Sequence, residues 1–456
     1  MSAATSSVSG APRILVLGGG SLGLYAARRL SKKLGRGARI TLVDANPYMT
    51  YLPFLPETAS GAISGRDVVA PFTRALPGVE AIQAKVTKID HAAKTVTVQP
   101  SEGDAFGVSY DEVVVALGSV SRTLPIPGVA EFAVGFKSVE EAVALRDRVL
   151  DNIFTAAHTK DEALRRRLLT FTFIGGGFAG IEAIAEVEDM ARAAVRKLPT
   201  LTESDLKFVV IEAMGRILPE LPLDLALYGL ANLRARGIEV HLETFLSGCV
   251  DGHVTTSTGL EFESDIVVWT AGVKANPVVT ESDLPTDKLG RLTVSATLQV
   301  VDEDGNVVPG AWGGGDTAAV PDLAADEEGK FCPPNAQHAT REGVVLAENL
   351  IATLRGGAVR EYRHKNLGVV ASLGLHKGVA NLLGAIKLKG WFAWATHRAY
   401  HVYAMPTPSR KIRILAGWLS ASVLRRELVS LSATENPDAG FRAVATPAKP
   451  KEESKG

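Results

Sequence analysis

The stretch of sequence that decides the fold is Arg13-Ile-Leu-Val-Leu-Gly-Gly-Gly-Ser-Leu-Gly23. Its first five residues form a predicted apolar strand, and Leu24 to Lys33 follows as a predicted helix. Gly18 permits the tight turn, Gly20 lets the backbone approach a pyrophosphate, and Gly23 allows the helix to pack close to the strand. The amide groups at the helix N-terminus then face the phosphates, so the pattern predicts a dinucleotide site that also includes Ser21 and Leu22.

An acidic residue completes this motif. The predicted strand Ile40 to Asp44 ends in a carboxylate 21 residues past Gly23, and an acid at about that distance accepts both hydroxyls of an adenosine ribose. A strand, a helix and an acid around the glycines favour a bound dinucleotide over a glycine-rich turn that holds no ligand.

A second stretch repeats the pattern. The strand Leu169 to Ile174 leads into Gly175-Gly-Gly177-Phe-Ala-Gly180, and the matching strand Phe208 to Glu212 again ends in an acid. A carboxylate at Glu212 repels a 2′-phosphate, so the prediction is NADH rather than NADPH, although Arg216 lies close along the chain. Glu182 follows the third glycine and is interpreted either as a solvated acid at a helix start or as a site residue.

Composition narrows the classes of function. The 456 residues are 46% hydrophobic and 22% charged, as in a globular protein of two or three domains. A formal net charge of −1 provides no basic field for nucleic acid. The only cysteines, Cys249 and Cys332, form no CxxC pair, which excludes the redox pair of a dithiol reductase. No apolar run reaches the ~20 residues that span a bilayer, and no metal site is predicted.

Taken together, these motifs resemble the flavoprotein oxidoreductases with two dinucleotide-binding domains, and within them the type II NADH:quinone oxidoreductases. The resemblance covers roughly residues 12 to 430. Val113 to Gly118 and Val267 to Gly272 look like the family's two strand-ending turns, and Ala311 to Asp316 looks like the motif whose Asp contacts the ribityl chain of FAD. Leu52 to Gly61 resembles the family's loop near the flavin. Val86, at the end of a predicted strand Ile82 to Val86, matches the position that contacts the adenine.

The resemblance also implies the residues of the acceptor site. Ala336 and Gln337 match the family's pair beside the flavin ring, and Arg341 stands where the family has a second glutamine. At this helical spacing both Gln337 and Arg341 are expected to meet one ligand. The resemblance further places Glu182 near the nicotinamide and the flavin. The expected catalytic residues are therefore Glu182, Gln337 and Arg341.

The implied fold is α/β, with two Rossmann-like dinucleotide-binding domains for FAD and NADH and a C-terminal amphipathic helical region for membrane attachment. The expected segments are 12–135 for the first part of the FAD domain, 136–280 for the NAD(H) domain, 281–383 for the second part of the FAD domain, 384–432 for the attachment helices and 433–456 for a disordered tail.

Aromatic and basic residues characterise the C-terminal region. Two helices, separated at Pro406 and Pro408, are expected to lie in the membrane interface, with Trp391, Trp394, Trp418 and Leu419 in the acyl boundary. Arg410, Lys411, Arg413, Arg425 and Arg426 are expected to face the headgroups. A homodimer interface is the alternative for the same apolar surface.

The predicted activity is hydride transfer from NADH to FAD and then two-electron reduction of a membrane quinone, menaquinone or ubiquinone, at the cytoplasmic face of the cell membrane. Two alternatives stay open: a related flavoprotein with another acceptor (sulfide:quinone-type chemistry or a soluble redox protein) and a redox sensor without turnover. Arg341 keeps the first alternative open, because an arginine also suits a carboxylate-bearing acceptor.

Overall fold

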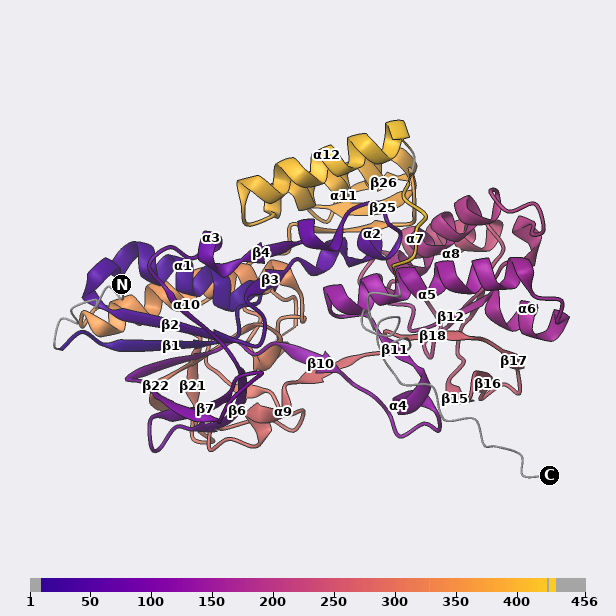
Figure 1. The fold of residues 1–456 in the computed structure, drawn as a ribbon. Coiled ribbons are helices and arrows are strands. Elements are labelled where there is room, and N and C mark those ends of the chain that lie inside the picture. The colour runs from indigo at the N-terminus through magenta and orange to yellow at the C-terminus, as the bar shows by residue number, and fades with distance from the viewer. Residues whose placement is uncertain (1–9, 328, 425, 432–456) are drawn as a thin grey trace, which may run out of the picture.

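The computed structural model describes residues 10–327, 329–424 and 426–431. Figure 1 shows two α/β units side by side, with a smaller C-terminal part lying across the top of both. The predicted tail 433–456 and Arg425 lie outside the described residues.

The first unit is built on a six-stranded sheet in the order β21-β22-β9-β1-β2-β5. The first glycine turn joins β1 to helix α1, and α10 packs against α1 on the same face of the sheet (Figure 1). Strands β21 and β22 come from late in the chain, so this sheet combines two distant segments. The elements are β1 Arg13–Leu17, α1 Ser21–Leu34, β2 Arg39–Asp44, β5 Glu80–Gln83, β9 Glu112–Val115, β21 Gln299–Val301, β22 Val307–Gly313 and α10 Ala336–Leu354.

A separate antiparallel sheet in this unit changes one prediction. The expected strand Ile82 to Val86 is wrong, because it is interrupted at Ala84, whose amide donates to the Asp44 carbonyl over 2.9 Å. Val86 is buried in the next strand, where it pairs with Val98. The sheet consists of β6 Lys85–Asp90, β7 Thr95–Gln99 and β8 Phe106–Ser109.

The second unit repeats the architecture with a parallel five-stranded sheet in the order β11-β18-β12-β13-β14. The second glycine turn joins β12 to α7, and α5 packs against α7. The elements are β11 Val134–Gly135, α5 Val139–His158, α6 Glu162–Leu168, β12 Thr170–Ile174, α7 Phe178–Val195, β13 Lys207–Ile211, α8 Leu223–Ala235, β14 Ile238–His241 and β18 Ile266–Trp269. A small sheet of β15 Leu246–Val250, β16 His253–Thr256 and β17 Glu261–Glu263 completes it.

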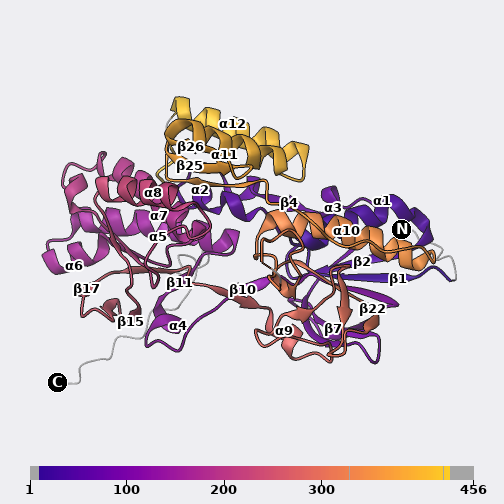
Figure 2. The ribbon, with the colours of Figure 1, turned by 180° about the vertical axis from the view of Figure 1, so that it is seen from behind.

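The chain crosses between the units twice at one place. β10 (Ser119–Ser121) leaves the first unit and pairs antiparallel with β19 (Val273–Ala275), which leaves the second. Both views place β10 between the two units (Figures 1 and 2). This ladder ties together the two turns that contain Gly118 and Gly272.

The C-terminal part begins as a sheet and ends as a helix pair. Strands β24 Gly368–Ser372, β25 Gly378–Leu382 and β26 Ile386–Lys389 precede α11 Gly390–Ala404 and α12 Pro408–Leu424. The two predicted helices are confirmed, but β26 occupies the beginning of the segment expected to be helical. No helix among the described residues is long and apolar enough to cross a membrane.

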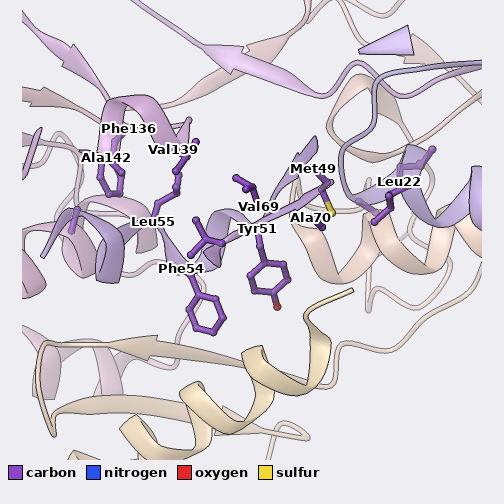
Figure 3. Close-up of a cluster of buried hydrophobic side chains, with 14 of the residues drawn as sticks. Leu22, Met49, Tyr51, Phe54, Leu55, Val69, Ala70, Phe136, Val139 and Ala142 are labelled. Carbon is purple, nitrogen blue, oxygen red and sulfur yellow. The ribbon is translucent and has the colours of Figure 1, made fainter. Parts of the chain in front are cut away.

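A continuous buried cluster of apolar side chains extends through both units. Figure 3 shows Met49, Tyr51, Phe54 and Leu55 between them, with Tyr51 and Phe54 pointing toward the C-terminal helices. The short helix α2 (Leu55–Ala59) packs against both α5 and α7. Because the core is shared, the geometry between the two units is held by side-chain packing as well as by the two crossings.

Candidate functional site: two glycine turns that open onto one cavity

The first glycine turn has the geometry that a pyrophosphate needs. Gly18 has φ +94° and donates its amide to the Val43 carbonyl over 2.8 Å. A Cβ at Gly23 would lie 1.8 Å from the Gly18 carbonyl oxygen, so only glycine allows α1 to start this close to β1. Gly20 is the N-cap of α1, and a Cβ there would meet nothing within 4 Å. The helix N-terminus therefore opens onto free space beside Ser21 and Leu22.

Asp44 lies beside this turn. Its Oδ2 accepts the Gly19 amide over 2.7 Å and its Oδ1 accepts the Asn46 amide over 2.8 Å. Burial raises the pKa of Asp44, and these two amides oppose that rise. The carboxylate is thereby held next to the phosphate end of the turn, a position that fits a ribose acceptor.

The second turn reproduces the first almost bond for bond. Gly175 has φ +113° and donates to the Ile211 carbonyl over 2.9 Å, and a Cβ at Gly180 would lie 2.2 Å from the Gly175 carbonyl oxygen. Glu212 accepts the amides of Gly176 and Met214, as Asp44 accepts those of Gly19 and Asn46. Gly177 is the N-cap of α7 and faces open space. Both turns therefore fit a dinucleotide.

Arg216 is directed away from this acid. Its guanidinium donates to the carbonyl of Leu221 and, over 3.4 Å, to that of Leu218. Both bonds are made by Nη2, so this nitrogen could reach a 2′-phosphate beside Glu212 only by breaking them.

The late glycine motif brings Asp316 to the crossing between the units. Ser119 Oγ donates to Asp316 Oδ2 over 2.7 Å, and Lys137 Nζ donates to Ser119 Oγ over 2.7 Å and to its carbonyl over 3.0 Å. Burial lowers the pKa of Lys137, while Asp316 opposes the change. Lys137 was missed from the sequence, where a lone lysine before a helix gives no signal. The turns at Gly118 (φ +67°) and Gly272 (φ +84°) flank this cluster, and neither would crowd a Cβ.

One cavity of about 880 Å³ connects the parts of the molecule. From the first unit it is lined by Ser21, Tyr25, Leu52 and Pro53 and by Leu55 and Pro56 of α2. The second unit contributes Phe178, Ala179, Glu182 and Gly272, and α11 contributes Tyr400, His401 and Tyr403. Lys137 and the start of α10 also line it. The cavity thus reaches both helix N-termini and the C-terminal helices.

Gln337 and Arg341, on α10, both line this cavity. The carboxamide of Gln337 donates to Asn366 and to the Gly368 carbonyl and accepts from the Leu367 amide over 2.8 Å. Gln337 therefore also holds α10 to the start of β24 and the residues before it, and its expected contact with a ligand stays a prediction. Arg341 Nη1 donates to the Gln337 carbonyl over 2.7 Å, and its other guanidinium donors make no hydrogen bond within the described part of the chain. Ala336 lines the cavity at the N-terminus of α10.

Glu182 is buried, in the second turn of α7, and the solvated interpretation is wrong. Its Oε1 accepts the Ser372 amide over 2.7 Å and lies 3.2 Å from His397 Nε2. The side chain also lines the cavity. An acid of the second unit is therefore in contact with β24 and α11 of the C-terminal part.

Further buried charges join the C-terminal helices to the two units. Glu57 on α2 accepts Trp418 Nε1 over 2.8 Å and lies 3.2 Å from Arg398 Nε. Glu186 on α7 accepts from Ser60 and from Arg426, the latter over 3.3 Å. These contacts join segments far apart in the chain, so no local sequence pattern indicated them.

These contacts correct the expected membrane face. Trp418 is directed inward, with its ring 5.7 Å from that of Phe54, and Arg426 is paired with Glu186. Arg410 lies 3.6 Å from Asp67 and is mostly buried. Trp418, Arg426 and Arg410 therefore do not face a bilayer, whereas Trp391 and Leu419 are exposed.

The structure also brings together Cys332, His338 and Glu342, whose potential ligand atoms lie within 4.8 Å of one another. Each has a protein partner: Cys332 Sγ approaches the Pro321 carbonyl, His338 contacts Tyr362 and Glu342 accepts the Gly315 amide. Burial raises the pKa of Glu342 to about 7. Cys249 lies in the core of the second unit.

The fold and the site define a protein that presents two dinucleotide-binding turns to a single cavity. The family model for pyridine nucleotide-disulphide oxidoreductases matches residues 12–343. A type II NADH:quinone oxidoreductase of Staphylococcus epidermidis is 32% identical over 380 residues, which cover 82% of this chain and 90% of that protein. A demethylphylloquinone reductase of Synechocystis, NdbB, is 29% identical over 423 residues, 90% of this chain and 96% of that protein. Among solved structures, NDH2 from Plasmodium falciparum in complex with NADH has the same fold, with a TM-score of 0.82 at 17% identity over 92% of this chain and 100% of that one.

The chain belongs to the pyridine nucleotide-disulphide oxidoreductase family and, within it, to the type II NADH:quinone oxidoreductases.

Proposed function

We propose that this chain binds FAD on the first unit and NADH on the second, and that it delivers the electrons of NADH to a membrane quinone, menaquinone or ubiquinone, through the shared cavity. Two of its relatives are named type II NADH:quinone oxidoreductases. The observation that supports this assignment best is the single cavity that touches both helix N-termini and α11.

The protein's contribution to such a reaction is positional and electrostatic. When bound, FAD would supply the redox chemistry, taking up a hydride from NADH and releasing two electrons to the acceptor. Gly18, Gly20, Gly23 and Asp44 are the residues that we assign to the FAD adenosine end, with Val86 at the adenine. Asp316, Gly118 and Ala336 are assigned to the rest of FAD. For NADH we assign Gly175, Gly177, Gly180, Glu212, Glu182 and Gly272. Arg341 is assigned to the acceptor.

We further propose that the chain is a peripheral protein of the cytoplasmic membrane face. The outer faces of the C-terminal helices carry apolar side chains that are more than half exposed: Trp391, Phe392, Tyr403, Ile412, Leu415, Leu419, Val423 and Leu424. Arg413 is exposed beside them. Apolar residues with flanking cations on paired helices suit an interfacial position. A homodimer would cover the same face, and the experiment on α12 in the Discussion distinguishes the two occupants.

The sulfide-oxidising alternative finds no support, because Cys249 is enclosed in the core of the second unit and belongs to a different apolar cluster from Cys332, so the two thiols cannot act as a pair. The deciding experiment is anaerobic stopped-flow with the detergent-purified protein. NADH should bleach the flavin absorbance, and a quinone analogue should restore it. Bleaching without reoxidation by quinone would overturn the proposed acceptor.

A further inference from the structure

Three side chains with metal-binding atoms meet on a side of α10 that does not line the cavity. His338 and Glu342 are four residues apart on α10, so they lie on one face of the helix, and Cys332 comes shortly before its first turn. The potential ligand atoms of the three lie within 4.8 Å of one another. None of the three lines the cavity, whereas Gln337 and Arg341 of the same helix do. The cluster is therefore separate from the site described above.

Each of these side chains has a binding atom that its protein partner leaves free. Glu342 accepts a backbone amide through Oε2 and makes no hydrogen bond through Oε1 in the described part of the chain. His338 contacts the Tyr362 hydroxyl over 3.0 Å through Nδ1, and its Nε2 has no hydrogen bond within the same residues. The Cys332 thiol makes a contact of 3.9 Å with a backbone carbonyl. A carboxylate oxygen, an imidazole nitrogen and a sulfur are therefore available together.

The acid of this cluster is buried without a paired cation. Glu342 is 1% exposed and forms no ion pair among the residues that the structure describes. Desolvation raises the pKa of this carboxyl to about 7. Asp322 adds negative charge near Cys332 and His338, and Arg341 acts on His338 in the opposite sense. A bound divalent cation would compensate the charge of the carboxylate, which the protein itself does not pair.

From this geometry we infer that Cys332, His338 and Glu342 form a Zn²⁺ site. Sulfur, imidazole and carboxylate are ligands of Zn²⁺, whereas Mg²⁺ and Ca²⁺ are bound by oxygen. On binding, the Cys332 thiol loses its proton to solvent, and the resulting thiolate binds the metal. Thiolate, carboxylate and Zn²⁺ are neutral together, which suits a buried site. Three protein ligands leave the fourth tetrahedral position to water.

Only a small closure of the cluster is needed to bind the ion. Zn²⁺ bonds at tetrahedral angles separate the ligand atoms by about 3.3–3.6 Å, so the widest separation must shorten by roughly 1 Å. Cys332 lies outside the helix and is only partly buried, so its side chain has room for this movement. The Tyr362 hydroxyl at His338 Nδ1 is the kind of outer partner that orients a metal-bound imidazole. The ion would join the segment before α10 to the helix itself.

The test is a Zn²⁺ titration of the FAD-loaded protein after dialysis against a chelator, with a chromophoric chelator as the competitor. We expect one tight equivalent of Zn²⁺ and a rise in the melting temperature, because the ion binds the folded chain. Cys332→Ser and Glu342→Gln each remove one ligand with little change of shape. Each should weaken binding by more than about 100-fold, the upper end of what the loss of an outer partner costs. Tyr362→Phe removes that outer partner and should weaken binding by about 10-fold.

A surface cluster supplies the matched control. His253 lies 2.7 Å from Glu263 and 3.6 Å from Glu261, and all three are exposed. His253→Gln should leave the tight equivalent and the rise in melting temperature unchanged. Absence of a tight equivalent in the intact protein, its survival in Cys332→Ser, or its loss in His253→Gln would each overturn the site. Co²⁺ gives a second readout, since its thiolate charge-transfer band should appear in the intact protein and be missing in Cys332→Ser.

Discussion

Trp418 Nε1 donates a hydrogen bond to Glu57 Oε2 over 2.8 Å, which joins α12 to the short helix α2 that packs against α5 and α7 of the second unit. The Arg398 guanidinium lies 4.3 Å from the Trp394 ring centre and 4.6 Å from that of Trp418. The C-terminal helices are thus held by buried polar contacts on their inner side. Their outer side takes no part in these contacts and is available to bind another surface.

Trp418→Phe should weaken this attachment. Phenylalanine keeps the aromatic contacts but leaves a buried carboxylate oxygen of Glu57 without its donor, at a cost of about 1.5–3 kcal/mol. Chemical denaturation should show that loss in the free energy of unfolding. Leu419→Ala, at the neighbouring position with a 66% exposed side chain, is the matched control and should be close to neutral. Equal stability of the two variants would contradict the importance of the Trp418 contact.

The glycine turn can be tested by separating folding from FAD binding. Gly20→Ala meets no atom within 4 Å and should fold normally, but its methyl group occupies the space in front of the helix N-terminus and should lower FAD retention. Gly23→Ala places a Cβ 1.8 Å from the Gly18 carbonyl oxygen and should destabilise the fold by about 1–3 kcal/mol. Gly37→Ala, which also meets no atom, is the control. Flavin absorbance after gel filtration and thermal unfolding provide the two readouts.

Both dinucleotide turns could be predicted from the sequence because their requirements are local. A glycine at 18 or 175 satisfies a positive φ, and a glycine at 23 or 180 avoids a clash with a carbonyl a few residues earlier. The acids Asp44 and Glu212 follow at strand ends, which a pattern can locate. Such features depend on neighbours along the chain.

The buried polar contacts could not be predicted, because they join residues that lie far apart along the chain. Glu182 meets His397 and Glu57 meets Trp418 across more than 200 residues. Tryptophan and arginine on a helix suit a membrane surface and a polar interface equally, so composition did not reveal that Trp418 and Arg426 point inward. Gln337 shows the same limit, since its helical position was predicted but its hydrogen bonds to Leu367 and Gly368, at the start of β24, were not.

The proposed membrane docking should depend on the outer side of α12. Replacing Ile412 and Leu419, which are 67% and 66% exposed, with Glu should release the protein from anionic liposomes, because two charges would enter the apolar boundary. Flotation at low and high salt measures this. Exchange of the exposed Leu164 and Leu289, on other surfaces, for Glu is the control. If the variant with Glu at positions 412 and 419 still floats with liposomes but changes its oligomeric state, the exposed face is a dimer interface instead.

Cofactor choice should depend on Glu212. Its carboxylate is held by the Gly176 and Met214 amides, while Arg216 is engaged with backbone carbonyls. A 2′-phosphate there would face a like charge, so NADH should be strongly preferred. Glu212→Gln should narrow the ratio of kcat/KM for NADH over NADPH by about tenfold, the equivalent of 1.4 kcal/mol. Glu243→Gln, a nearby exposed acid, should leave the ratio unchanged. Equal use of both cofactors by the intact enzyme would contradict the assignment.

Arg341 should act on the acceptor step alone. It lines the cavity on α10 and donates through one nitrogen to the Gln337 carbonyl, which leaves further guanidinium donors for a quinone oxygen. Arg341→Ala should preserve flavin bleaching by NADH and slow reoxidation by quinone by about 10- to 100-fold, the equivalent of a charge-assisted hydrogen bond of about 1.5–3 kcal/mol. Arg355→Ala, an exposed arginine just past the end of α10, is the matched control and should change neither step. Arg341→Lys keeps the positive charge but loses the planar pair of donors. If its reoxidation rate lies between those of Arg341→Ala and the intact enzyme, the charge accounts for part of the effect. If its rate equals that of Arg341→Ala, the effect depends on the planar geometry of the guanidinium. Slower bleaching with normal reoxidation would place Arg341 on the nicotinamide side and contradict the prediction.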